Sequence, residues 1–214
     1  MPLNPLVLPN LAAIQRRARA LAMLEAIVCP EWPDRYYSYN RKWGPGEEMS
    51  SMRNGSGDDW FLLFGQFGAG IKGLAHESQV AGDSELLLAA RTSLPTNFQS
   101  FLAEPAFSWD WMSFCYWRSQ SDESWNRVVH PDPGKAEVDD GSEEFLALLH
   151  EPARAYVEFA EWYYEVSIPE DSVETLYLCK PLTDSLVKSL NPELSLKDIA
   201  SDATEIGYPL SSDA

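Results

Sequence analysis

Residues 60–75 read WFLLFGQFGAGIKGLA, and this stretch decides the fold class. Its first five residues, Trp60 to Phe64, are all apolar, which is typical of a strand that is covered on both faces. The three glycines between Gly65 and Gly70 then supply the conformational freedom that a tight turn needs. Ile71 to Ala75 continues as a partner strand. We therefore predict a β-hairpin in the middle of a sheet.

Predicted helices lie on either side of this hairpin along the chain. Asn10 can cap a helix whose apolar residues recur every three or four positions up to Val28, which leaves Arg16 and Arg19 on the opposite, solvated face. A second amphipathic helix follows Pro152, with aromatic residues on one face and glutamates on the other. Shorter helices are predicted over residues 84–91, 95–104, 169–178, 183–190 and 195–203.

Further strands are predicted where aromatic residues gather, over residues 35–43, 109–118 and 125–129. Strands thus cluster in the middle of the chain and helices at its ends, instead of alternating. This order favours an α+β fold with a mostly antiparallel central sheet flanked by N-terminal and C-terminal helices. We expect residues 1–214 to form a single domain, with a helix and sheet portion over 1–131 and an acidic helical portion over 132–214.

The composition restricts the class of partner. Lys and Arg number 16 against 33 Asp and Glu, so the formal net charge is −17, and 45% of the residues are apolar. That apolar content is ample for a packed interior, whereas nucleic acids and anionic membranes are held by basic residues. Residues 108–214 hold 7 basic and 22 acidic residues and therefore carry −15 of the total. We expect a basic protein as the partner, and neither nucleic acid nor a membrane.

Cysteine content and hydropathy indicate a soluble cytoplasmic protein. Cys29, Cys115 and Cys179 are widely separated and odd in number, which argues against a disulfide framework and against a zinc knuckle. No stretch approaches the roughly 18 consecutive apolar residues of a membrane helix. Arginines also interrupt the apolar N-terminal segment, where a secretory signal has an uncharged core. The oligomeric state is left open.

Several motifs resemble known binding loops but lack an essential position. The spacing G-x-x-G-x-G at residues 65–70 reverses the dinucleotide fingerprint and leads into a strand. His76-Glu77 opens like a zinc-protease helix, but Val80 stands where the second histidine belongs. The run at 54–59 lacks the glycine position and the closing glutamate of a calcium loop, and the run at 139–144 is better explained as a helix start. We therefore predict no cofactor and no metal site.

One region is dense in polar and aromatic side chains without matching a catalytic template. If the segments 35–43, 60–64 and 71–75 are neighbouring strands, their polar ends meet at one rim. Trp, Tyr and Arg dominate binding hot spots, although on strands they also serve core and edge packing, so both interpretations stay open. The candidate binding residues at this rim are Tyr36, Tyr39, Asn40, Trp43, Arg53, Asp58, Lys72, His76 and Glu77.

Several stretches resemble a group of bacterial cytoplasmic proteins that has no assigned activity. They are residues 20–27, 35–40, 52–58, 72–78, 180–183 and 205–209, so the resemblance covers nearly the whole chain. It implies no particular activity. The pattern from Leu94-Pro95 to Phe101-Leu102 before an aromatic strand is similar to the SMI1/KNR4 group of immunity proteins. That similarity implies neutralisation of a toxin.

Two functions are compatible with these observations. The first is a protein-binding module for a basic partner such as a toxin domain, because complementary charge speeds encounter and aromatic anchors then hold the complex. The second is an enzyme or a small-molecule-binding protein that uses the rim. There His76 would act as the general base, oriented by Asp58 or Glu77. Tyr39 or Arg53 would hold an oxyanion or a carboxylate.

Overall fold

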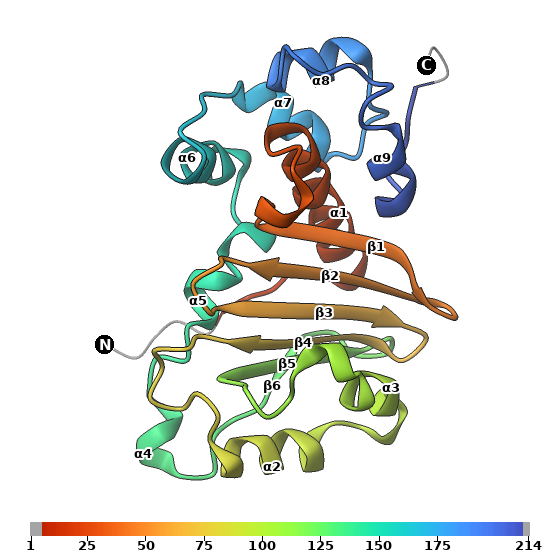
Figure 1. Ribbon diagram of the computed structural model, residues 1–214. Coiled ribbons are helices and arrows are strands. Elements are labelled where there is room, and N and C mark those ends of the chain that lie inside the picture. The colour runs from red at the N-terminus through yellow and green to blue at the C-terminus, as the bar shows by residue number, and fades with distance from the viewer. Residues whose placement is uncertain (1–5, 212–214) are drawn as a thin grey trace. The chain divides into compact units, whose positions relative to one another are not determined.

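The chain folds into two compact units of mixed helix and strand. The computed structural model describes residues 6–211 (Figure 1). The first unit contains residues 1–11 and 51–147, and the second unit contains residues 12–50 and 148–214. Six strands of the described residues form one sheet in chain order, β1-β2-β3-β4-β5-β6. The prediction of an α+β fold with a mostly antiparallel sheet and flanking helices is confirmed.

The strands are β1 (Tyr37–Gly44), β2 (Glu47–Arg53), β3 (Asp59–Gly65), β4 (Gly68–Leu74), β5 (Phe114–Ser119) and β6 (Asn126–Arg127). The α-helices are α1 (Leu11–Val28), α2 (Ser84–Ser93), α3 (Gln99–Ala103), α4 (Pro133–Ala136), α5 (Ser142–Phe145), α6 (Ala153–Tyr163), α7 (Glu170–Tyr177), α8 (Asp184–Leu190) and α9 (Ala200–Ile206). Within residues 6–211, none of the helices combines the length and the apolar character needed to span a bilayer.

The predicted hairpin is formed by β3 and β4, which pair antiparallel from Asp59 opposite Leu74 to Gly65 opposite Gly68. Its turn is tighter than the glycine run suggests, because β3 ends at residue 65 and β4 begins at residue 68. Gly68 has a φ of 127°, and a Cβ there would lie 2.0 Å from the backbone oxygen of Arg118, so this position requires glycine. β5 pairs antiparallel with β4, and β6 pairs antiparallel with β5.

Both faces of β3 are covered, as its uninterrupted apolar sequence predicts. The strand is buried from Trp60 to Phe64. Successive side chains point to opposite faces. On one face, the ring of Phe61 stacks on Phe107 with centroids 4.9 Å apart. On the other, the indole N–H of Trp60 donates to the backbone oxygen of Phe145 at 2.8 Å. The core of the first unit is built around this strand.

Two parts of the sheet differ from the prediction. The strand expected over 109–118 begins only at Phe114, because Ser108 has a φ of 47° and the chain turns there. The indole N–H of Trp109 donates to the backbone oxygen of Phe101 at 3.0 Å, so this aromatic residue packs on α3 instead of extending the sheet. β2 has no predicted counterpart, because its sequence EEMSSMR lacks the β-branched and aromatic residues typical of strands.

In the second unit, α1 is amphipathic in its first half and buried on all sides in its second half. Every residue of Ala20–Ile27 is buried, including Glu25. Arg16 is exposed as predicted. Arg19 is half-buried and forms an ion pair with Glu48, so the prediction of a solvated Arg19 is wrong. Arg19 is held by the carboxylate of Glu48, and the helical pattern of α1 cannot reveal this partner.

Candidate functional site

The nine predicted rim residues are distributed over both units. Those in the second unit are Tyr36, Tyr39, Asn40 and Trp43. Those in the first unit are Arg53, Asp58, Lys72, His76 and Glu77. Among the nine, Asp58, His76 and Glu77 line a common cleft.

The rim residues of the second unit make contacts within that unit. The ring of Tyr36 packs edge-on against the aromatic rings of α6. The hydroxyl of Tyr39 donates to the carboxylate of Glu48, and burial raises the pKa of Tyr39. The side-chain oxygen of Asn40 accepts from a backbone N–H two residues further on, and Trp43 is half-buried. These contacts stabilise β1 and its surroundings.

Lys72 lies in the middle of β4 and is completely buried. Its Nζ lies 2.9 Å from Asp59 Oδ1 and 5.6 Å from the centre of the Phe61 ring. Burial lowers the pKa of Lys72, although the ion pair with Asp59 opposes this effect. The guanidinium of Arg53 lies 5.7 Å from the same ring. Lys72 is therefore an internal ion-pair partner, and its amine does not line the cleft.

Asp58 and His76 form a hydrogen-bonded pair that the hairpin register brings together. Asp58 precedes β3 and His76 follows β4, and these two strand ends are neighbours because the strands are antiparallel. His76 Nδ1 lies 2.7 Å from Asp58 Oδ1, and the backbone N–H of His76 donates to the same oxygen at 2.8 Å. The carboxylate therefore holds a proton on Nδ1 and leaves Nε2 as the nitrogen that can contact a ligand.

This pair changes the acidity of both partners. The hydrogen bond to Asp58 raises the pKa of His76, and the charge of Glu77 adds to the effect. Glu77 Oε1 lies 4.0 Å from His76 Nε2. Burial alone would raise the pKa of Asp58, but its hydrogen bonds with His76 and Asn54 outweigh burial and lower it. The charged form of each partner thus stabilises the charged form of the other.

The loop before β3 holds the Asp58 carboxylate in place. Asn54 Nδ2 donates to Asp58 Oδ2 at 2.6 Å, and Asn54 Oδ1 accepts from the backbone N–H groups of Ser56 and Asp58 at 2.8 and 3.1 Å. Gly57 has a φ of 113°, and a Cβ there would lie 3.4 Å from the His76 ring. Glycine therefore lets the loop close against the imidazole.

The Asp58–His76 pair borders a cleft of about 480 Å³ in the first unit. The hydroxyl of Ser78 joins two of its walls by donating to the backbone oxygen of Asp139 at 2.7 Å. Among the described residues 6–211, no lysine or arginine lines it. Its lining carries four carboxylates, those of Asp58, Glu77, Asp139 and Glu144. We call this the His76 cleft.

Asp139 and Glu144 are not among the site residues predicted from the sequence. The acidic run 139–144 is predicted to start a helix, and this is confirmed, because α5 begins at Ser142 and Asp140 Oδ1 accepts from the backbone N–H of Ser142 at 3.0 Å. The concentration of acidic residues in this run is the only feature of the sequence that could have marked Asp139 and Glu144 as site residues. Its place beside His76 depends on a chain reversal that no local pattern reveals.

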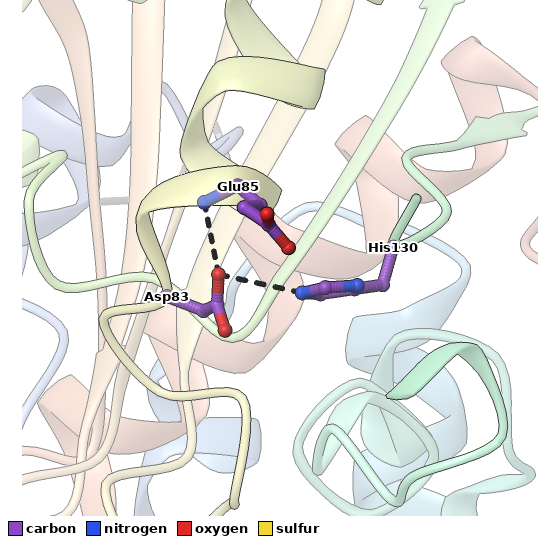
Figure 2. Close-up of side chains that lie close together, drawn as sticks. All are labelled: Asp83, Glu85 and His130. Atoms are coloured by element: carbon purple, nitrogen blue, oxygen red, sulfur yellow. Dashed lines mark hydrogen bonds and ion pairs between the residues drawn. The ribbon is translucent and has the colours of Figure 1, made fainter. Parts of the chain in front are cut away.

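A second group of side chains in the first unit consists of Asp83, Glu85 and His130, which offer ligand atoms within 4.8 Å of one another (Figure 2). His130 Nε2 lies 3.4 Å from Asp83 Oδ1, and the His130 side chain is only 2% exposed. Asp83 caps α2 by accepting from the backbone N–H of Glu85 at 2.9 Å. A histidine and two carboxylates are a donor set that suits zinc and similar ions.

Two contacts oppose a metal ion in this cluster. His130 Nδ1 accepts from the backbone N–H of Asp132 at 3.0 Å, so the neutral ring carries its proton on Nε2, the atom that would have to bind the metal. Lys135 Nζ lies 2.6 Å from Asp83 Oδ2, and this hydrogen bond lowers the pKa of Asp83 well below its usual range. The cluster ties the 130–135 segment to the start of α2.

The His76 cleft has two chemical capabilities. Its carboxylates can bind a cationic group, and the Asp58–His76 pair can take up a proton. Comparison of the chain with protein-family models, with curated proteins and with solved structures found no match. A function is therefore inferred from the geometry of the cleft alone.

Proposed function

We propose that this protein binds a cationic side chain of a basic partner protein in the His76 cleft. The observation that carries the proposal is the lining of four carboxylates without a lysine or arginine. A cleft lined by one sign of charge focuses its field and concentrates ligands of the opposite sign. A lysine or arginine side chain on a protein surface is long enough to enter such a cleft.

Basic residues next to the cleft are already engaged with other carboxylates. Arg127 Nη2 lies 2.8 Å from Asp140 Oδ2, and Lys72 Nζ lies 2.9 Å from Asp59 Oδ1. Both carboxylates directly neighbour cleft residues in the sequence. The two ion pairs thus hold Arg127 and Lys72 on carboxylates that do not line the cleft. Within the lining, His76 can supply one positive charge against four carboxylates, so a cation from outside is the natural counter-charge for the others.

The overall charge also supports a basic partner. The first unit has 15 acidic and 6 basic residues and the second has 18 and 10, so they carry −9 and −8. Complementary charge raises the rate of encounter and selects against partners of like charge. A toxin domain that is neutralised in an immunity-type complex is the partner class that we propose. Nucleic acid is disfavoured by the same charge.

The proposal can be tested by calorimetric titration with a hexalysine peptide at low salt. We expect the double substitution Glu77→Gln/Glu144→Gln to weaken binding about fivefold, because exposed ion pairs contribute up to about 1 kcal/mol each. The control Asp110→Asn/Glu123→Gln removes the same charge from exposed positions outside the cleft lining. It should change the affinity less than about twofold. Equal losses in both variants would mean that net charge alone attracts the peptide, and would refute the proposal.

A second candidate function, an enzyme with His76 as general base, is favoured by the 2.7 Å contact between Asp58 and His76. A carboxylate that orients a histidine in this way is the arrangement of many hydrolases. The hydroxyl of Ser78 is directed to the backbone oxygen of Asp139, so Ser78 is not poised as the nucleophile. The base would therefore act on water or on a group of the substrate.

A screen with chromogenic esters, amides and phosphodiesters separates the two functions. Turnover that is lost in His76→Gln, while hexalysine binding remains, would establish the enzyme. Absence of turnover together with peptide binding that depends on Glu77 and Glu144 would establish the binding module. Asp110→Asn/Glu123→Gln serves as the folded control in both assays.

A further inference from the structure

The outer face of α6 in the second unit carries aromatic rings that neither candidate function uses. The helix has the predicted amphipathic form, with Tyr156 and Ala160 buried. On the next face, the rings of Phe159 and Tyr163 stack with centroids 5.3 Å apart and planes at 14°. The ring of Trp162 lies 5.9 Å from that of Tyr163, and Trp162 is 77% exposed. The indole of Trp162 is thus exposed to solvent next to the packed rings of Phe159 and Tyr163, which we call the base.

Tyr36, which directly precedes β1, completes this base. Its ring makes edge-on contacts with Phe159 and Tyr163, with centroids 4.9 and 5.0 Å apart. We call Tyr36, Phe159, Trp162 and Tyr163 the aromatic strip. Three of its rings are half-buried and brace one another, so the strip is a preformed surface that loses little conformational freedom when a ligand binds.

Three exposed glutamates lie on α6 or just after it, close to Trp162 in the sequence. Glu158, Glu161 and Glu165 are exposed and lie four residues before, one before and three after Trp162. Burial raises the pKa of Tyr163, and the charges of the buried Glu25 and of Asp34 add to the effect. Arg154 is held by Glu158 at 2.9 Å, one turn further back on the helix. The electrostatic environment of the exposed ring therefore favours a cation.

We infer that the aromatic strip is an interaction surface for exposed arginine side chains of a protein partner. A guanidinium is planar and weakly hydrated, so it can stack on the indole of Trp162 while its N–H groups reach a nearby glutamate carboxylate. A lysine ammonium is more strongly hydrated and makes no planar contact. This inference concerns the second unit and holds whether or not the His76 cleft binds a ligand.

The test is an NMR titration with hexa-arginine, made in the Glu77→Gln/Glu144→Gln background so that the cleft does not contribute. The indole N–H signal of Trp162 is assigned by its loss in Trp162→Phe. We expect this signal to shift, and we expect Trp162→Ala to weaken binding about fourfold, as a solvent-exposed cation–π contact predicts. Trp162→Phe should retain part of the affinity because it keeps an aromatic face.

Trp111→Ala is the matched control, because Trp111 is 63% exposed and belongs to the first unit. It should leave the hexa-arginine affinity unchanged. Hexalysine should bind the same background more weakly than hexa-arginine and shift the Trp162 signal less. The inference is overturned by an unmoved Trp162 signal, by an unchanged affinity of Trp162→Ala, by an equal loss in Trp111→Ala, or by hexalysine binding as tightly as hexa-arginine. Circular dichroism confirms that each variant is folded.

Discussion

Glu25 in the second unit and Asp58 in the first unit each accept several hydrogen bonds, but only Asp58 holds an exposed side chain. Glu25 is 0% exposed. Asp58 binds His76, whose side chain is 43% exposed. A buried carboxylate with all its partners inside the protein stabilises the fold and can do little else. A carboxylate that holds an exposed ring prepares a site, because the far nitrogen of that ring can meet a ligand.

The surroundings of Glu25 explain its structural role. It accepts from the hydroxyls of Tyr156, at 2.8 Å, and Tyr164, and from the backbone N–H groups of Tyr36 and Tyr37 at 2.7 and 3.3 Å. Burial raises the pKa of Glu25, and the hydrogen bonds from the tyrosines oppose this. One side chain on α1 thus joins β1 to α6 and the residues that follow it.

Glu25→Ala should cause the greatest loss of stability. It removes the acceptor of two backbone N–H groups and two hydroxyls, of which the Tyr37 N–H and the Tyr156 hydroxyl are buried, and this should lower the free energy of unfolding by about 3–5 kcal/mol. Chemical denaturation monitored by circular dichroism measures this loss. Glu31→Ala, which removes an exposed glutamate from the same unit, should change the free energy of unfolding by less than about 0.5 kcal/mol. A similar small change in both variants would contradict the structural role of Glu25.

Glu25 should also give the free energy of unfolding a characteristic pH dependence. The pKa of Glu25 in the folded protein is raised above the ordinary value of 4.5. At a pH between 4.5 and this folded pKa, the folded state therefore binds the proton more tightly than the unfolded state. The stability of the wild type relative to Glu25→Gln should therefore be greatest below about pH 4.5 and fall as the pH rises through the folded pKa. Denaturation at a series of pH values checks this, and a difference that does not vary with pH would exclude it.

Gly57→Ala should cost more than Gly55→Ala, although both glycines have positive φ. At Gly55, with a φ of 73°, nothing lies within 4 Å of an added Cβ. At Gly57, the φ of 113° is less accessible to alanine and the Cβ meets the His76 ring. We expect losses of about 1 kcal/mol for Gly55→Ala and about 2 kcal/mol for Gly57→Ala. Thermal denaturation measures both, and equal losses would argue against a close contact between the loop and the ring.

Asp58→Asn should lower the pKa of His76. The hydrogen bond and the charge of Asp58 are the main causes of the raised pKa, and asparagine removes the charge. An NMR titration of the imidazole signals measures the change. Glu77→Gln should lower the pKa less, because Glu77 contributes through charge alone at 4.0 Å. A His76 pKa that stays at its wild-type value in Asp58→Asn would show that the pair does not form in solution.

The elements that could be predicted depend on neighbours in the sequence. The hairpin at 60–75 and the amphipathic helices α1 and α6 are encoded in periodicity and turn residues, so local patterns identify them. The contact between Asp58 and His76 follows from the hairpin once its register is known. β2 could not be predicted, because strands without β-branched or aromatic residues are stabilised by the sheet around them.

The residues that could not be predicted are brought together over long distances. Glu25 is the one polar residue among residues 20–27, the buried part of α1, and its partner Tyr156 lies 131 positions away. Asp139 and Glu144 line the same cleft as His76, although α2, α3, β5, β6 and α4 separate them from it in the chain. The distribution of charge over the two units could not be predicted for the same reason. Residues 108–214 carry −15, yet each unit combines distant segments, so the units share the charge as −9 and −8.

The most direct test of the cation-binding cleft is the pKa of His76 measured by NMR with and without hexalysine. A cation bound beside the ring disfavours the imidazolium, so saturation with the peptide should lower the pKa of His76 and leave the pKa of His150, in the second unit, unaffected. By the same linkage, the peptide should bind more tightly as the pH rises through that pKa. A His76 pKa that is identical in the free and peptide-saturated protein would contradict the proposed cleft function.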